Sequence, residues 1–185
     1  GGALKGYNTD GAGFYRSLVE DLHFEPEGKR VFVLGAGGAG RAIVMYLGNG
    51  PKAISVYDVD EEKGRSLKNS YKAYYDEKRF ILVGKEDFKK AIGEADLFVN
   101  ATPVGMKADD QSPVDKDLLH PSLRVYDLVY NQKTTALVKE AAGRKLHAMT
   151  GIGMLLYQGA IAFEIWTGRK APIDVMRKAL KEALK

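Results

Sequence analysis

Apolar residues follow two different spacings along the chain, and the two spacings alternate from one end to the other. Short, continuous apolar runs rich in β-branched residues are typical of buried strands, whereas an apolar residue on every helical turn is typical of an amphipathic helix. The continuous runs predict strands at residues 30–34, 53–57, 80–83, 96–100, 124–128 and 145–149.

Helical spacing fills the intervals between these runs and extends to both ends of the chain. Thr9 or Asp10 is a suitable N-cap for a first helix, which Pro26 and Gly28 terminate. Because strands alternate with helices, we predict an α/β fold, a Rossmann-like, doubly wound and mostly parallel six-stranded sheet with helices on both faces. Further helices are predicted at residues 38–47, 60–75, 86–92, 134–143, 154–166 and 173–184.

The first predicted strand runs directly into a glycine-rich turn that opens the next helix. In the pattern Gly-x-Gly-x-x-Gly, Gly37 lets a pyrophosphate approach the backbone and Gly40 lets the helix pack closely on the sheet. The alternatives are a turn that only packs, or a related loop that binds FAD or S-adenosylmethionine. Cofactor contacts are predicted at Gly35, Ala36, Gly37, Gly38 and Ala39.

Asp58 follows the second predicted strand, where a Rossmann unit places an acid that binds the adenosine ribose hydroxyls. A carboxylate there repels a 2′-phosphate, so we predict NAD as the cofactor. Lys63 and Arg65 lie close by in sequence and leave NADP as a second cofactor. The alternative is a turn residue at the strand end, because Asp60 follows two positions later.

The chain is predicted to have three parts. Residues 1–24 form a linking turn and helix, residues 25–150 form the dinucleotide-binding Rossmann domain, and residues 151–185 form C-terminal helices. The sequence begins without an initiator Met and in what resembles the middle of a turn, so we expect a fragment of a longer protein.

Ligands of open parallel sheets bind beyond the carboxyl ends of the strands, which directs attention to the polar residues there. Asn100 and Thr102 are predicted near the nicotinamide, unless the turn through Pro103 serves geometry alone. Gly151 opens a predicted helix whose N-terminus is expected to face the ligand at these strand ends. Gln158, further along that helix, contacts a polyhydroxylated substrate or is a plain surface residue.

Composition and charge bear on whether the chain binds nucleic acid, a metal ion or a membrane. The net charge of +4 comes from basic residues interleaved with acidic ones, so no nucleic-acid partner is predicted. The chain has no cysteine, and its three histidines lack ligand spacing, so no metal site is predicted. No apolar run approaches the length of a membrane span; we expect no membrane association and a cytoplasmic location.

Five motifs, in order, resemble the shikimate dehydrogenase family. The resemblance implies reversible hydride transfer between 3-dehydroshikimate and shikimate, in aromatic amino-acid biosynthesis. It also implies an N-terminal substrate domain and a C-terminal nucleotide domain, with the active site between them. The motifs are Asn8–Gly11, Gly35–Ala39, Asn100–Met106, Tyr126–Tyr130 and Gly151–Gln158.

The resemblance assigns further roles. Asp10 is implied to be the catalytic acid that pairs with a lysine and touches substrate hydroxyls, with Tyr130 and Gln158 as further substrate contacts. Val129 and Met154 are implied to join the cofactor contacts, together with Asp58, Asn100, Thr102 and Gly151.

The family's catalytic lysine lies in a segment of the type Ser-x-x-Asn-Val-Thr-x-Pro-x-Lys, and nothing in this sequence resembles it. We therefore expect the C-terminal half of such an enzyme, inactive alone, that meets shikimate or quinate only with the N-terminal domain. The alternatives are a stand-alone NAD-binding module, a quinate/shikimate dehydrogenase or a Rossmann methyltransferase. An uncovered cleft face around Met154 favours a homo-oligomer.

Overall fold

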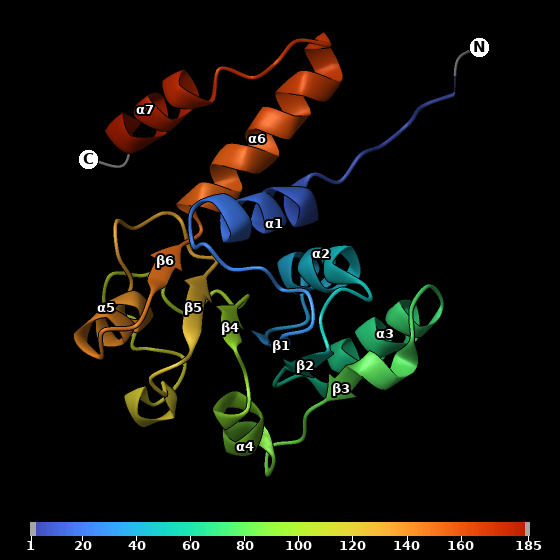
Figure 1. Cartoon of the computed structure of the whole chain (residues 1–185), viewed down its shortest axis with the longest axis vertical. Helices are drawn as coiled ribbons and strands as arrows, with labels where there is room; N and C mark the ends of the chain where they lie inside the picture. Colours follow the sequence, from blue (N-terminus) through green and yellow to red (C-terminus); the bar gives the residue numbers. More distant parts are fainter. Residues whose placement is uncertain (1–2, 184–185) are drawn as a thin grey trace.

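The computed structural model describes residues 3–183, and its centre is a six-stranded sheet (Figure 1). The strand order is β3-β2-β1-β4-β5-β6, and every neighbouring pair is parallel. The predicted Rossmann-like fold is confirmed, with a sheet that is entirely rather than mostly parallel. The strands are β1 (Arg30–Leu34), β2 (Ala53–Tyr57), β3 (Phe80–Leu82), β4 (Leu97–Asn100), β5 (Arg124–Asp127) and β6 (Ala148–Thr150).

Helices cover both faces of the sheet, as predicted (Figure 1). One face carries α1 (Asp10–Glu20), α2 (Gly38–Leu47) and α3 (Glu61–Lys72), and the other carries α4 (Phe88–Gly93) and α5 (Ala136–Gly143). The long helix α6 (Ile152–Thr167) packs on α1, and α7 (Ile173–Ala183) packs on α6. Short 3-10 turns lie at Glu77–Arg79 and Lys116–Leu118.

The strand predicted at residues 145–149 begins only at Ala148, because Lys145 adopts a left-handed conformation with φ 62° just after α5 ends. The predicted end of the last helix, Leu184, lies outside the described residues.

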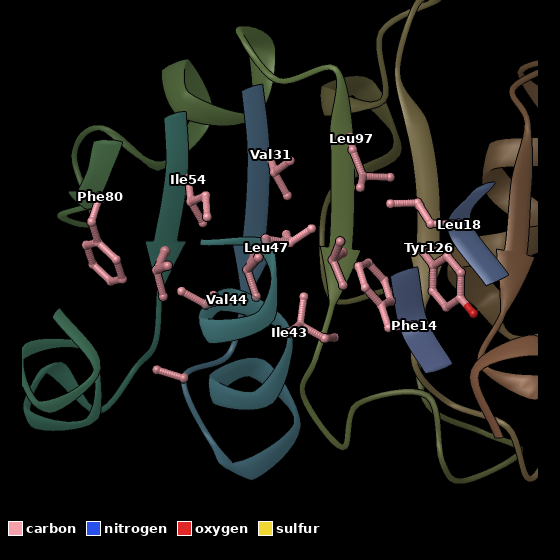
Figure 2. Close-up of a cluster of buried hydrophobic side chains, with 14 of the residues drawn as sticks. Phe14, Leu18, Val31, Ile43, Val44, Leu47, Ile54, Phe80, Leu97 and Tyr126 are labelled. Carbon is pink, nitrogen blue, oxygen red and sulfur yellow. The ribbon is translucent and has the colours of Figure 1, made fainter. Parts of the chain in front are cut away.

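The central strands β1, β4 and β5 read as continuous apolar runs because both of their faces are buried. Successive side chains point to opposite faces, so Val31 and Val33 of β1 face α1 to α3, while Phe32 and Leu34 face α4 and α5. Figure 2 shows the first of these two cores, in which Phe14 of α1 lies beside the ring of Tyr126. Their centroids are 5.0 Å apart in an edge-to-face arrangement.

Helix α1 crosses α6 with almost no space between the two backbones. A methyl group at Gly13 would lie 2.5 Å from the backbone nitrogen of Gln158 and 2.8 Å from its Cα. Because backbone atoms cannot move aside as a flexible side chain can, the crossing requires glycine at this position.

A buried polar group joins β4 to β5 where the register pairs Asn100 with Asp127. Asp127 Oδ1 accepts hydrogen bonds from Asn100 Nδ2 at 2.8 Å and from the Val129 N–H at 3.2 Å, while its Oδ2 accepts one from Thr135 Oγ1 at 2.6 Å. Burial raises the pKa of Asp127, and the three hydrogen bonds offset part of that increase.

We predict that Gly13→Ala lowers the free energy of unfolding by about 3 kcal/mol, because the added methyl group must separate α1 from α6. Urea denaturation measures the change. Gly143→Ala is the matched control, since Gly143 is also helical and no described atom lies within 4 Å of its added methyl group. We expect this control to be neutral or to stabilise by up to about 1 kcal/mol. Equal losses in the two variants would contradict the requirement at Gly13.

The stability of the folded chain should depend on pH through Asp127. Because the pKa of Asp127 is higher in the folded chain than in the unfolded chain, its contribution to stability is complete below the unfolded pKa of about 4. That contribution is lost as the pH rises through the folded pKa. Asp127→Asn removes the titration, so the stability difference between the chain and this variant should be largest near about pH 4 and shrink toward about pH 7.

Urea denaturation at several pH values checks this profile. Asp109→Asn, at an exposed carboxyl group, is the control and should leave the profile unchanged. A difference for Asp127→Asn that grows with pH would contradict the raised pKa.

Candidate functional site

The glycine-rich turn lies at the carboxyl ends of the strands, between β1 and α2, where the strand order reverses from β1 to β4. Gly35 donates its N–H to the Tyr57 carbonyl at 2.7 Å, and a methyl group at Gly40 would overlap the Gly35 carbonyl oxygen. At Gly37 and Gly38, no described atom lies within 4 Å of an added Cβ. The backbone of these two residues, at the N-terminus of α2, is therefore open to a ligand.

Asp58 connects the end of β2 to this turn. Its Oδ2 accepts a hydrogen bond from the Ala36 N–H at 2.7 Å, and its Oδ1 accepts one from the Asp60 N–H at 2.9 Å. These two hydrogen bonds order the turn and place the Asp58 carboxylate beside the glycines, while its contact with a ribose stays a prediction. A pocket of about 600 Å³ adjoins it, lined by Tyr57, Asp58, Val59, Glu61, Leu82, Val83, Gly84, Lys85 and Glu86.

The cations near Asp58 are engaged by neighbouring side chains. Lys63 lies 3.6 Å from Asp60, and Arg65 pairs with Glu61 and Glu62 at 3.1 and 3.3 Å. Arg41 of α2, which the sequence analysis did not single out, donates to the hydroxyl groups of Ser70 and Ser66 on α3 at 2.7 and 3.1 Å.

Asn100 and Thr102 have different surroundings. Asn100 is fully buried, and its Oδ1 accepts from the N–H and the hydroxyl group of Thr102 at 3.1 and 2.7 Å. Thr102 reaches the surface in a pocket of about 240 Å³, whereas Asn100 is not among the residues that line it. That pocket is lined by Ala39, Ala101, Thr102, Pro103, Met106, Leu128, Val129, Tyr130 and Asn131.

A third pocket, of about 290 Å³, brings together residues predicted from four distant segments. It is lined by Asp10, Ala39, Leu128, Tyr130, Gly151, Met154, Leu155 and Gln158. Ala39, Leu128 and Tyr130 line this pocket and the Thr102 pocket, so the two are neighbours. The predicted substrate contacts and several predicted cofactor contacts therefore lie side by side.

The polar groups of this pocket are held in place from α1. Thr9, the N-cap of α1, donates its hydroxyl hydrogen to Gln158 Oε1 at 3.2 Å, and the Asp10 N–H donates to Asn8 Oδ1 at 2.9 Å. The Gln158 amide also donates one hydrogen to the Leu155 carbonyl oxygen at 3.4 Å, which leaves its second amide hydrogen for a ligand, while Asp10 is a carboxylate acceptor. Donors and an acceptor in one pocket suit a ligand with several hydroxyl groups.

Two apolar residues that line this pocket, Leu128 and Leu155, are not among the contacts predicted from the sequence. Arg41, which lies outside the pocket and joins α2 to α3, was not predicted either. Leu128 and Arg41 had a local signal, since they directly follow Asp127 at the end of β5 and Gly40 in the turn. A separate hollow of about 350 Å³ near Arg30, Lys52 and Lys90 contains none of the predicted site residues. Within residues 3–183, no helix is both long enough and apolar enough to span a bilayer.

Comparison with known proteins identifies the same family as the motifs do. Residues 151–181 match the family model described as Shikimate 5'-dehydrogenase C-terminal domain. Over its whole length the chain is 41% identical to shikimate dehydrogenase (NADP(+)) from Methanopyrus kandleri, of which it covers 65%.

Solved structures agree. Shikimate 5-dehydrogenase from Listeria monocytogenes, in complex with shikimate and NAD, has a TM-score of 0.84 at 32% identity, covering 93% of this chain and 62% of that one. Quinate dehydrogenase from Corynebacterium glutamicum, in complex with NAD, has a TM-score of 0.87 at 29% identity, covering 95% of this chain and 62% of that one. The chain thus spans less than two thirds of the length of each of these relatives. Over its whole length it is therefore similar to the C-terminal part of enzymes of the shikimate dehydrogenase family.

Proposed function

We propose that this chain is the nucleotide-binding part of an NAD(P)-dependent shikimate dehydrogenase, which interconverts 3-dehydroshikimate and shikimate. The observation that carries the proposal is the shared wall of two pockets. Ala39, Leu128 and Tyr130 separate the pocket that contains Thr102 from the pocket that contains Asp10 and Gln158. A cofactor on one side of this wall and a polyol on the other meet at a common edge, as hydride transfer requires.

The residues present fit a dinucleotide. The open backbone of Gly37 and Gly38, at the start of the ten-residue helix α2, suits a pyrophosphate. Asp58 suits the adenosine ribose at one end. At the other end Thr102, Val129, Gly151 and Met154 would surround the nicotinamide, with Asn100 holding the Thr102 loop from below. The nicotinamide supplies or accepts the hydride when bound.

Toward the substrate, Asp10 would accept hydrogen bonds from hydroxyl groups, and Tyr130 and Gln158 would donate to its oxygens. In the family's pattern the acid corresponding to Asp10 works with a lysine that moves the proton of the carbinol oxygen. No segment of these 185 residues resembles the one that carries that lysine. We therefore propose that the chain alone binds cofactor without turnover, and that residues 1–24, 25–150 and 151–185 have the roles given above.

The charges around Asp58 favour NAD over NADP. Asp58, Asp60, Glu61 and Glu62 form an acidic turn, and the nearby Lys63 and Arg65 are paired with three of these carboxylates. A 2′-phosphate would have to compete with these pairs. The Methanopyrus relative is named for NADP(+), and the Listeria structure contains NAD, so both cofactors occur among relatives. We propose NAD as the preferred cofactor and NADP as the weaker one.

A quinate or quinate/shikimate dehydrogenase is the second candidate. The Corynebacterium quinate dehydrogenase supports it, because its TM-score with this chain is 0.87. The two substrates differ in their ring hydroxyls, and the polar groups of Asp10, Tyr130 and Gln158 suit a polyol of either kind.

We predict that calorimetric titration of the chain shows binding of NAD, weaker binding of NADP, and no oxidation of shikimate or quinate. S-adenosylmethionine, the ligand of the alternative glycine loop, is the control and should not bind. Turnover by the purified chain would place the acid–base group within these 185 residues. Absence of NAD binding would overturn the proposed function.

We also predict that Asp58→Asn changes the ratio of NAD to NADP affinity by about tenfold in favour of NADP, because the substitution removes a ribose acceptor and a repelling charge. The same titrations measure the ratio. Asp60→Asn is the matched control. Asp60 lies two residues from Asp58 and caps α3, so this substitution removes an equal charge without altering the Asp58 carboxylate. If both variants move the ratio equally, net charge rather than contact at Asp58 sets the preference.

A further inference from the structure

Helix α6 begins in the pocket without the side chain that usually caps a helix. Its N-cap is Gly151, and a methyl group there would overlap the Leu128 carbonyl oxygen and lie 2.7 Å from the carbonyl carbon. Serine, threonine, asparagine and aspartate, the residues that cap helices best, are therefore excluded at this position. The N–H groups of the first turn need another acceptor.

One acceptor comes from strand β5. The N–H of Met154, the third residue of α6, donates to the Tyr126 hydroxyl oxygen at 3.1 Å. An N-cap side chain normally accepts from this same backbone position or the one before it. Tyr126 thus takes the place of the missing cap from outside the helix.

The Tyr126 hydroxyl is itself held by a directed series of hydrogen bonds. It donates to Ser17 Oγ at 2.8 Å, and Ser17 donates to Asp21 Oδ2 at 3.2 Å. Arg177 of α7 donates to the other Asp21 oxygen at 3.2 Å. Because the series ends on a carboxylate and each bond polarises the next, the Tyr126 oxygen becomes a stronger acceptor for Met154.

The ring that carries this hydroxyl group is enclosed by its neighbours. Tyr126 is fully buried, and Phe14 packs edge-on against it at 5.0 Å. Burial also raises the pKa of Tyr126, so the phenol keeps the proton that it donates to Ser17. On the helix side, a methyl group at Gly153 would overlap Ser17 Oγ, so the first turn of α6 rests directly on α1.

We propose that Tyr126 is a positioning residue, which caps α6 from behind and thereby fixes Gly151 and Met154 at the nicotinamide end of the cofactor site. This inference rests on the proposed function for the identity of the ligand. Tyr126 lines none of the pockets described above, so it acts through the helix and not by contact with ligand. A phenylalanine would keep the ring packing and leave the Met154 N–H without its acceptor.

If Tyr126 acts in this way, the two halves of the cofactor should depend on it differently. Met154 and Gly151 serve the nicotinamide half, whereas Asp58 and the glycine turn serve the ADP-ribose half, which ADP-ribose alone also occupies. Without the cap, the first turn of α6 would be loose, and NAD would lose binding free energy because it must order this turn. ADP-ribose has no nicotinamide and does not contact this turn, so its affinity would not fall. We therefore expect Tyr126→Phe to weaken NAD by about fivefold, the size expected of one helix cap, with ADP-ribose unchanged.

Tyr157→Phe is the matched control for this titration. Tyr157 is another buried tyrosine, on α6 itself, and its hydroxyl group contacts Glu20 at 2.9 Å, Asp21 at 3.3 Å and Arg177 at 2.7 Å. These contacts lie at the Asp21 end of the series, so the variant leaves the acceptor of the Met154 N–H in place. This variant should lose stability without a change in the ratio of NAD to ADP-ribose affinity. Equal weakening of both ligands by Tyr126→Phe, or no weakening of NAD, would overturn the proposal.

Amide hydrogen exchange in the unaltered chain tests the cap without any ligand or variant. Among the described residues the Ile152 N–H has no acceptor, whereas the Met154 N–H of the same turn has Tyr126. We expect Met154 to exchange at least about tenfold more slowly than Ile152, and equal rates would overturn the cap. A protected Met154 amide in a chain that fails to bind NAD would instead count against the proposed function alone.

Discussion

Helix α1 comes first among the regular elements, yet it packs between the sheet and α6, and its contact with Tyr126 determines where the pocket lies. Phe14 and Leu18 bury their side chains against the sheet, while Gly13 allows the backbone of α6 to approach on the other side. The start of α1 carries Asp10, so the same packing that completes the core also sets the position of this carboxylate. Any change that moved α1 from α6 would separate Asp10 from Gln158.

Strand β5 holds the start of α6 at two points. The Gly151 N–H donates to the Val129 carbonyl oxygen at 2.9 Å, just beyond the strand, and the Met154 N–H donates to Tyr126 within it. Asp127 follows Tyr126 directly, and its side chain points to the opposite face of the sheet, where it orders the Asn100 and Thr135 side chains. Alternate residues of one strand therefore organise two different parts of the site, which follows from the two-residue period of a strand.

The sequence was sufficient for the elements and for the glycine turn, because their signals are local. Continuous apolar runs marked the strands, and Gly35 to Gly40 required no knowledge of distant residues. Contacts between α1 and the C-terminal part were not predictable in this way. Thr9 meets Gln158 across 149 positions, and Tyr126 meets Ser17 across 109, and neither pair shares a spacing or a motif. Asp58 is intermediate between the local and the distant cases. Its place after a strand predicted either a ribose contact or a turn residue, and its two hydrogen bonds serve the turn.

The polar network behind the pocket also explains why so many buried polar atoms are tolerated in this layer. An isolated buried hydroxyl group or carboxylate destabilises a fold, but each member of the series from Met154 to Asp21 has a partner. Arg177 supplies the positive charge that compensates Asp21 and contacts Tyr157, whose pKa burial raises to about 12. The last helix, α7, has no fully buried residue, and this arginine joins it to the network that ends at the first turn of α6. Packing of the C-terminal helices and the geometry of the pocket are thus parts of one hydrogen-bonded system.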